Sequence, residues 1–158
     1  MDNYTLLKAD ITLETEGLIV SGCNLSGANG SGLAGALKAK WPIVYDKYME
    51  IYKKWKSEGN IFANLGKIDV IHIENDLYVA NGFTQKYYGY DGKRYADPDA
   101  IKQVLERSFN FCLLYNIPLK TVKIGCDRGG LSWENEIEPI LLELMKQYPE
   151  VNVTIFTQ

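Results

Sequence analysis

The stretch from residue 18 to residue 37 restricts the fold of this chain more than any other. It begins with the apolar run of residues 18–20, whose length and composition are typical of a buried strand. It continues through the first glycine loop, residues 22–32, and ends in the apolar spacing of a helix. Glycines let backbone N–H groups converge on one ligand, and a helix N-terminus favours negative charge. The stretch therefore predicts an anion-binding loop between a strand and a helix.

The first glycine loop matches neither of the two common phosphate-binding patterns. It lacks the G-K-[ST] of a P-loop and the G-x-G-x-x-G spacing of dinucleotide-binding proteins. Taken alone, it is equally compatible with a tight connection whose glycines serve only packing. Asn24 stands where the strand is predicted to end, and its amide can donate to and accept from a sugar hydroxyl.

A second unit of the same kind lies near the end of the chain. Residues 121–124 predict a strand, and the second glycine loop, residues 125–135, follows directly, with Ser132 as the predicted N-cap of a helix. The carboxyl ends of strands in an open α/β sheet meet at the edge where ligands bind. Two such loops at one edge fit a ligand that carries more than one phosphate.

The remaining segments complete an α/β domain. We predict strands over residues 4–7, 68–73, 77–80 and 151–156, and helices over residues 33–41, 43–56 and, from the N-cap Asp97, to about 116. The apolar spacing of Val44, Tyr48 and Trp55 predicts a packing face. Strands separated by helices require crossovers, so we expect a sheet that is covered on both faces.

Residues 81–95 connect the predicted hairpin to the next helix and show little periodicity. Irregular segments of this length are often binding loops, from which Gln85, Lys86 and Arg94 would reach a ligand. An ordered surface loop is the alternative.

The length and charge limit the class of protein. We expect one domain over residues 1–158. The net charge of -3 argues against a general nucleic-acid-binding protein, which needs a basic surface, but permits a small anion bound by backbone amides. The first fifteen residues lack the apolar centre of a signal peptide, and no apolar run approaches the roughly 20 residues that span a bilayer. We therefore expect no membrane partner. With cysteines that indicate no disulfide framework, we expect a cytoplasmic protein, and we further expect a monomer.

The cysteines and the histidine do not indicate a metal site or a Cys–His hydrolase. An odd number of cysteines without C-x-x-C spacing indicates neither a disulfide framework nor a zinc site. We therefore assign apolar packing to Cys23, Cys112 and Cys126. The single histidine, His72, lies on the polar side of a predicted strand and is expected at the surface. We expect neither a metal nor a cofactor.

Four motifs, in order over nearly the whole chain, resemble those of macro domains, the ADP-ribose-binding modules. They are K-A-D-I near the start, G-C-N-x5-G-S-G-L-A-x-A from Gly22, I-G-C-x3-G-L-x-W-E-N from Ile124, and the final V-T-I-F. The nearest branch contains the ADP-ribose-1″-phosphate phosphatases and the terminal ADP-ribose protein glycohydrolases. The resemblance implies a three-layer α/β/α fold with a mixed central sheet and helices on both faces.

The resemblance also implies ligand contacts. Asp10, which from its position alone is an ordinary turn carboxylate, would accept a hydrogen bond from the adenine amino group, beside the Ile11 backbone. Phe156 would flank the adenine, and Asn24 would bind the distal ribose. The other residues implied at the ligand are Gly22, Gly30, Ser31, Gly32, Leu33, Gln85, Gly125, Cys126, Asp127, Arg128, Gly129, Gly130 and Leu131.

The sequence departs from the catalytic residues of two macro-domain hydrolases. Ala34 stands where the mono-ADP-ribosyl hydrolases carry an Asp, and Gly129 stands at the Asp position of terminal ADP-ribose glycohydrolase, whose Lys falls near Gln85 or Lys86. Our preferred reaction is the removal of phosphate from ADP-ribose-1″-phosphate. It needs an oriented water and neutralisation of the leaving phosphate.

We assign the water to Asp127, the ribose to Asn24 and the terminal phosphate to Arg128. A salt bridge that shapes its own loop is the alternative role for Asp127. A non-catalytic reader or sponge of ADP-ribose, or of a related NAD-derived nucleotide, and a de-ADP-ribosylating glycohydrolase are the alternative functions.

Overall fold

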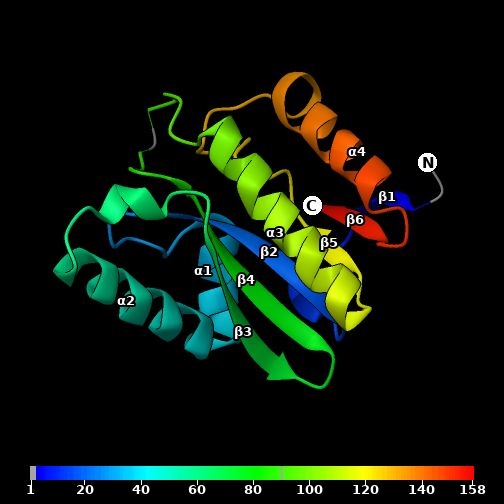
Figure 1. Cartoon of the computed structure of the whole chain (residues 1–158), viewed down its shortest axis with the longest axis horizontal. Coiled ribbons are helices and arrows are strands. Elements are labelled where there is room, and N and C mark those ends of the chain that lie inside the picture. Colours follow the sequence, from blue (N-terminus) through cyan, green and yellow to red (C-terminus); the bar gives the residue numbers. More distant parts are fainter. Residues whose placement is uncertain (1–2, 90) are drawn as a thin grey trace.

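The computed structural model describes residues 3–89 and 91–158 (Figure 1). The strands are β1 (Tyr4–Lys8), β2 (Gly17–Asn24), β3 (Ile68–Glu74), β4 (Leu77–Gln85), β5 (Leu119–Thr121) and β6 (Val153–Thr157). The helices are α1 (Gly32–Lys40), α2 (Pro42–Ser57), α3 (Pro98–Tyr115) and α4 (Glu138–Gln147). Short 3-10 turns cover Ile11–Leu13 and Ile61–Asn64, and a π-helical turn, Trp133–Ile137, leads into α4.

The six strands form one mixed sheet in the order β1-β6-β5-β2-β4-β3. All neighbours are parallel except β3 and β4, which form the predicted antiparallel hairpin. Helices α3 and α4 cover one face, and α1 and α2 lie on the other (Figure 1). The expected three-layer α/β/α architecture is confirmed.

The position of β2 inside the sheet, between β5 and β4, explains why residues 18–20 are continuously apolar. Leu18 and Val20 point into the core under α3 and α4, whereas Ile19 points into the core under α1 and α2. A strand buried on both faces needs no polar alternation. Each of these three side chains is fully buried.

Helix α3 begins where the sequence predicts it. The Asp97 carboxylate accepts hydrogen bonds from the backbone N–H groups of Asp99 at 2.9 Å and Ala100 at 3.3 Å. Pro98 occupies the first helical turn, where no N–H is needed. The helix ends at Asn116, which has a φ of 55°. The predicted N-cap and the predicted end are both confirmed.

Strand β4 is longer than predicted. Residues 81–85, which we assigned to an irregular loop, continue the strand because it pairs with β2 on one side and β3 on the other. Asn81 is fully buried, and its Nδ2 donates to the backbone oxygen of Val44 at 3.1 Å. Gly82 leaves room for Val104 of α3. Pairing with the neighbouring strands and the absence of a Cβ at Gly82 keep this segment in the sheet. Its local hydrophobic pattern does not predict a strand.

Strands β5 and β6 are displaced from their predicted positions. The prediction of a strand over residues 121–124 is wrong, because β5 ends at Thr121. The N–H of Ile124 donates to the oxygen of Val122 at 2.7 Å, so the chain turns out of the sheet here. Strand β6 begins at Val153 because the N–H of Val151 is used in a turn onto Tyr148.

His72 and the cysteines have the environments predicted for them. His72 is exposed, with its Nε2 2.7 Å from the backbone oxygen of Asn75. Cys23 and Cys112 are buried and Cys126 is partly buried, all as free thiols. No described helix combines the length and apolar character that crossing a bilayer requires.

Candidate functional site

Two adjoining cavities lie at the carboxyl ends of the parallel strands. Cavity A, of about 440 Å³, lies between the two glycine loops and the end of β4. Cavity B, of about 500 Å³, lies between the segment after β1, the start of α1 and the end of β6. The residues that line both are Gly32, Leu33, Val122, Lys123 and Asp127. The two cavities therefore adjoin at the N-terminus of α1, and we call the two together the cleft.

Most residues predicted at the ligand line this cleft. Those in the wall of cavity A are Gly22, Asn24, Gly30, Ser31, Gly32, Leu33, Gln85, Gly125, Asp127, Arg128 and Gly129. Those in cavity B are Asp10, Ile11, Cys126 and Phe156, together with the shared Gly32, Leu33 and Asp127. The two glycine loops do meet at one edge of the sheet, as their positions after β2 and β5 predict.

Gly130 and Leu131 are the exceptions. Leu131 is buried in the core under α3 and α4, and its N–H donates to the backbone oxygen of Gly125 at 3.0 Å. The N–H of Gly130 donates to the oxygen of Asp127 at 3.3 Å. These two residues therefore close the second glycine loop, and the structure does not bring them to the cavity wall.

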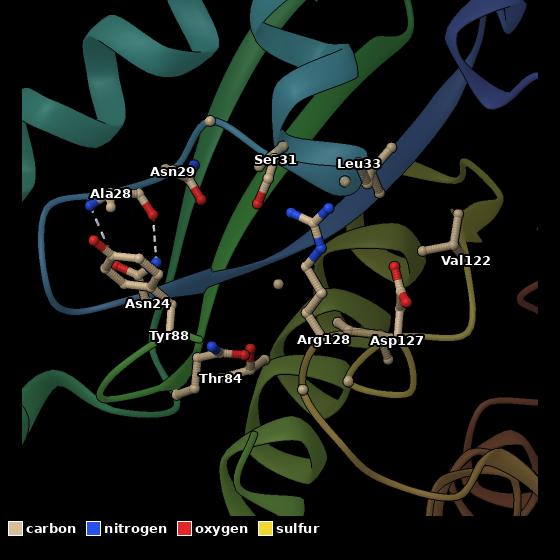
Figure 2. Close-up of a pocket in the computed structure, with 18 of the residues that line it drawn as sticks. Asn24, Ala28, Asn29, Ser31, Leu33, Thr84, Tyr88, Val122, Asp127 and Arg128 are labelled. Atoms are coloured by element: carbon tan, nitrogen blue, oxygen red, sulfur yellow. Dashed lines mark hydrogen bonds between the residues drawn. The ribbon is translucent and has the colours of Figure 1, made fainter. Parts of the chain in front are cut away.

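Asn24 holds the first glycine loop in shape. Its Oδ1 accepts from the N–H groups of Ser26 at 3.0 Å and Ala28 at 3.4 Å, and its Nδ2 donates to the oxygen of Ala28 (Figure 2). The Tyr48 hydroxyl also lies 3.0 Å from Oδ1. The acceptor oxygen that we expected to be available to a sugar is therefore already used within the protein.

Tyr48 of α2 connects the packing face of that helix to the first glycine loop. Its hydroxyl lies 2.9 Å from the backbone oxygen of Asn24 and accepts from the N–H of Gly27 at 3.2 Å. The side chain is fully buried. Gly27 packs closely against the Tyr52 ring, because a Cβ at residue 27 would lie 2.9 Å from that ring. The sequence predicted only a packing role for Tyr48, because its polar partners come from a distant segment.

The second glycine loop places its two charged side chains differently. Arg128 extends across cavity A toward Ser31 at the start of α1 (Figure 2). Asp127 lies beside Val122, at the end of cavity A that adjoins cavity B, whereas Asn24 lies at the opposite end (Figure 2). The structure therefore brings Asp127 and Arg128 to the cleft but separates Asp127 from Asn24.

Position 129 has no room for a side chain. A Cβ on Gly129 would lie 2.5 Å from the backbone oxygen of Gly125 and 2.9 Å from the Ala96 side chain. The Gly129 oxygen accepts from the N–H groups of Tyr95 at 2.9 Å and Ala96 at 3.0 Å. The Gly125 backbone and the Ala96 side chain therefore leave no space for an Asp at position 129.

Two of the three side chains predicted at the ligand from residues 81–95 lie elsewhere. Arg94 forms an ion pair with Glu136 at 2.7 Å, and Lys86 lies over the Phe62 ring at 5.4 Å, so neither side chain is directed to a ligand. Gln85 does line cavity A, and its Nε2 donates to the oxygen of Tyr87 at 2.6 Å. Tyr90 of the predicted loop lies outside the described residues.

Several cleft residues had no sequence signal. Lys123 lines both cavities, with its Nζ 4.0 Å from Glu134 in an exposed pair. The other lining residues that we did not predict are Ala9, Thr12, Ala28, Asn29, Ala34, Ala36, Thr84, Tyr88, Gly89, Val122, Ile124, Thr157 and Gln158. Most are small or apolar, so their side-chain chemistry gives no sequence signal for a ligand site.

The Asp10 carboxylate is oriented within cavity B. Its Oδ1 accepts from the Thr12 N–H at 2.9 Å and the Thr12 hydroxyl at 2.7 Å. These hydrogen bonds hold the pKa of Asp10 below its usual range, so it stays an acceptor-only carboxylate near neutral pH.

Replacement of Asp10 by Ala is expected to weaken binding of an adenine nucleotide in cavity B by about tenfold, the loss typical of one charge-assisted hydrogen bond. Calorimetric titration with ADP-ribose measures the effect. Replacement of Asp76, an exposed hairpin carboxylate, by Ala is the control. Equal affinity of the Asp10 variant and the wild type would show that Asp10 does not contact the base.

The Cys126 thiol is expected to react slowly. Burial, and then Glu134 and Glu136, raise its pKa to about 11. Such a thiol is roughly 0.1% ionised at pH 8, against roughly 25% for an ordinary cysteine. Alkylation by iodoacetamide in the native protein should therefore be at least about tenfold slower than that of free cysteine. Urea-unfolded protein is the control, and rapid alkylation of native Cys126 would contradict the prediction.

Comparison with known proteins agrees with the fold. No protein-family model matches the chain. The DNA ADP-ribosyl glycohydrolase of Mycobacterium tuberculosis is 28% identical over 154 residues, which is 96% of this chain and 40% of that protein. The chain therefore spans less than half the length of this curated relative.

Solved structures match over nearly the whole chain. The macrodomain protein of Streptomyces coelicolor has a TM-score of 0.80 and 21% identity, with 98% of this chain and 99% of that chain covered. The Thermosipho africanus DarTG complex with ADP-ribose has a TM-score of 0.78 and 21% identity, covering 99% of this chain and 42% of that one. The chain therefore has the macrodomain fold.

Proposed function

We propose that this chain binds ADP-ribose in an extended conformation along the cleft and hydrolyses an ADP-ribose derivative at C1″ of the distal ribose. The observation that carries the proposal is that cavities A and B adjoin at the N-terminus of α1. Together they have the size and the few convergent polar groups of a nucleotide site.

Each part of ADP-ribose has chemically suitable surroundings. Phe156 and Ile11 offer apolar surface for adenine, beside the Asp10 carboxylate. The diphosphate fits the shared junction, where the start of α1 carries the positive end of the helix dipole, and where Lys123 and Arg128 supply cations. The distal ribose is left for the part of cavity A between Arg128 and Asn24. This order gives Asp10, Lys123 and Arg128 each a partner of suitable charge or hydrogen-bonding character.

Two hydrolytic reactions at C1″ are candidates. In phosphate removal from ADP-ribose-1″-phosphate, Arg128 neutralises the departing phosphate, and its extension across cavity A favours this reaction. In glycohydrolysis, water attacks C1″ as the bond to the carrier breaks, and the likeness to a DNA ADP-ribosyl glycohydrolase favours this one. In both, we assign to Asp127 the acceptance of the water proton.

One preparation without added metal tests the whole proposal. Calorimetric titration with ADP-ribose is followed by assays of phosphate release from ADP-ribose-1″-phosphate and of ADP-ribose release from ADP-ribosylated single-stranded DNA. Micromolar binding with one of the two products identifies the reaction. Binding without either product would leave a reader or sponge of ADP-ribose, and no binding at all would remove the proposal.

Asp127 and a matched acid separate binding from chemistry. Asp127→Asn is expected to keep ADP-ribose affinity within about threefold and to lower turnover by about a hundredfold, the range typical of a lost general base. Asp76→Asn, on the exposed hairpin turn, should change neither quantity. Wild-type turnover in Asp127→Asn would contradict the catalytic role and favour the loop-shaping alternative.

A further inference from the structure

The outer end of cavity A has an aromatic rim. Tyr88 lines the cavity while 49% of its surface stays exposed, and the neighbouring Tyr87 is 57% exposed. Figure 2 places Tyr88 beside Asn24 and Ala28, at the end of the cavity away from Asp127. We call residues 85–88 the rim segment.

The rim segment is fixed to the first glycine loop. The N–H of Leu25 donates to the oxygens of Gln85 at 3.0 Å and Lys86 at 3.2 Å. The Ser26 hydroxyl donates to the oxygen of Lys86 at 2.6 Å. A ring held on an anchored backbone at the mouth of a cavity loses little conformational freedom on binding, so its contacts translate efficiently into affinity.

The rim segment carries a second exposed ring, Tyr87, directly before Tyr88. The Tyr87 ring packs edge-on against Phe62 with their centres 5.3 Å apart, and Lys86 lies over the same phenylalanine. Exposed aromatic rings with a cation beside them are the surface on which planar nitrogen heterocycles stack.

Charge argues against a phosphate at this end. Among the described residues that line cavity A, the two cations are Lys123, which also lines cavity B, and Arg128, which extends toward Ser31. The cavity residues labelled near Tyr88 in Figure 2 are the uncharged Asn24, Ala28 and Thr84. Lys86 of the rim segment lies over the Phe62 ring and does not line the cavity, so a doubly charged group here would meet uncharged cavity residues and an aromatic ring.

Resting on the proposed function, we infer that Tyr88 forms a stacking subsite for a planar nitrogen heterocycle carried on C1″ of the distal ribose. The substrates of this chain are then ADP-ribose conjugates of such rings. Two sources share this chemistry: a nucleobase of a nucleic acid and the nicotinamide of NAD⁺.

Four ligands that differ only at C1″ test the inference. They are ADP-ribose, ADP-ribose-1″-phosphate, NAD⁺, and a single-stranded oligodeoxynucleotide carrying ADP-ribose on one base. Affinities are measured by calorimetry for the wild type, Tyr88→Ala and Tyr88→Phe, in the Asp127→Asn background where a ligand is turned over. Tyr115→Ala, which removes a comparably exposed tyrosine at the end of α3, is the matched control.

A ring-bearing ligand is expected to bind about five- to tenfold more tightly than ADP-ribose, as one stacking contact provides. Tyr88→Ala should remove this gain and Tyr88→Phe should keep it, while ADP-ribose affinity stays within twofold in both. A gain with the oligonucleotide identifies a nucleobase, and a gain with NAD⁺ identifies nicotinamide.

Three results would overturn the inference: no ring-bearing ligand exceeds ADP-ribose, the gain survives Tyr88→Ala, or the 1″-phosphate ligand shows the gain instead. These results leave ADP-ribose binding intact. Failure of ADP-ribose itself to bind would instead reject the proposed function on which the inference rests.

Discussion

Replacement of Gly30 by Val is expected to weaken ADP-ribose binding by about a hundredfold while the protein stays folded. Gly30 lines cavity A, its φ lies outside the left-handed region, and a Cβ there would meet nothing within 4 Å. The added methyl groups therefore project into the space reserved for the ligand. Forcing a ligand past them costs about 3 kcal/mol, which corresponds to the hundredfold loss.

The matched control for Gly30→Val is Ala39→Val, which adds a branched side chain on the exposed side of α1. Calorimetry gives the affinities, and thermal unfolding gives the stabilities. Both variants should unfold within about 0.5 kcal/mol of the wild type, apart from the small helix-propensity cost at residue 39. Unchanged affinity in Gly30→Val would mean that the ligand does not occupy cavity A.

Tyr48→Phe is expected to lower the free energy of unfolding by about 2 kcal/mol, because the Gly27 N–H and the Asn24 oxygen lose a buried partner. The ring contacts with Tyr52 and Phe83 remain. Since the hydroxyl holds the first glycine loop in shape, we also expect ADP-ribose affinity to fall by about tenfold.

Tyr45→Phe provides the control for Tyr48→Phe. Tyr45 lies on the same helix, 6.4 Å from Tyr48 between ring centres, and only partly buried. Removing the Tyr45 hydroxyl should change the free energy of unfolding by less than about 0.5 kcal/mol and leave ADP-ribose affinity unchanged. If Tyr48→Phe lowered stability but kept full affinity, the loop geometry would not depend on this hydroxyl.

Asp127 and Asn24 lie at different ends of cavity A, and this separation limits the roles that they can share in the reaction. Asp127 stands near the junction of the cavities, whereas Asn24 lies at the outer end and is occupied by its own loop. Asp127 and Asn24 would therefore contact different parts of a ligand that extends along the cleft. Asn24→Ala should act mainly by disordering the first glycine loop, and thus on affinity rather than on turnover alone.

The local sequence determined those features whose physical cause lies within a few residues. Asp97 and Pro98 start α3 through hydrogen bonds and a ring that involve only the next residues. The two glycine loops follow buried strands, so their meeting at one edge follows from the parallel order of the sheet. The resemblance of four motifs to macro domains extended this to the whole α/β/α architecture.

Long-range contacts decided the rest. Residues 81–85 are strand because they pair with β2 and, at Asn81 and Gly82, with β3. Leu131 belongs to the core because α3 and α4 close over it. The hydroxyl of Tyr48 reaches Asn24 across 24 positions of sequence. Hydrophobic periodicity and motif spacing in a sequence report only on residues that are close together along the chain. The partners of Tyr48, the orientation of Asp127 and the joining of the two cavities were therefore decided by the tertiary structure, which alone brings distant backbone and side chains within hydrogen-bonding distance.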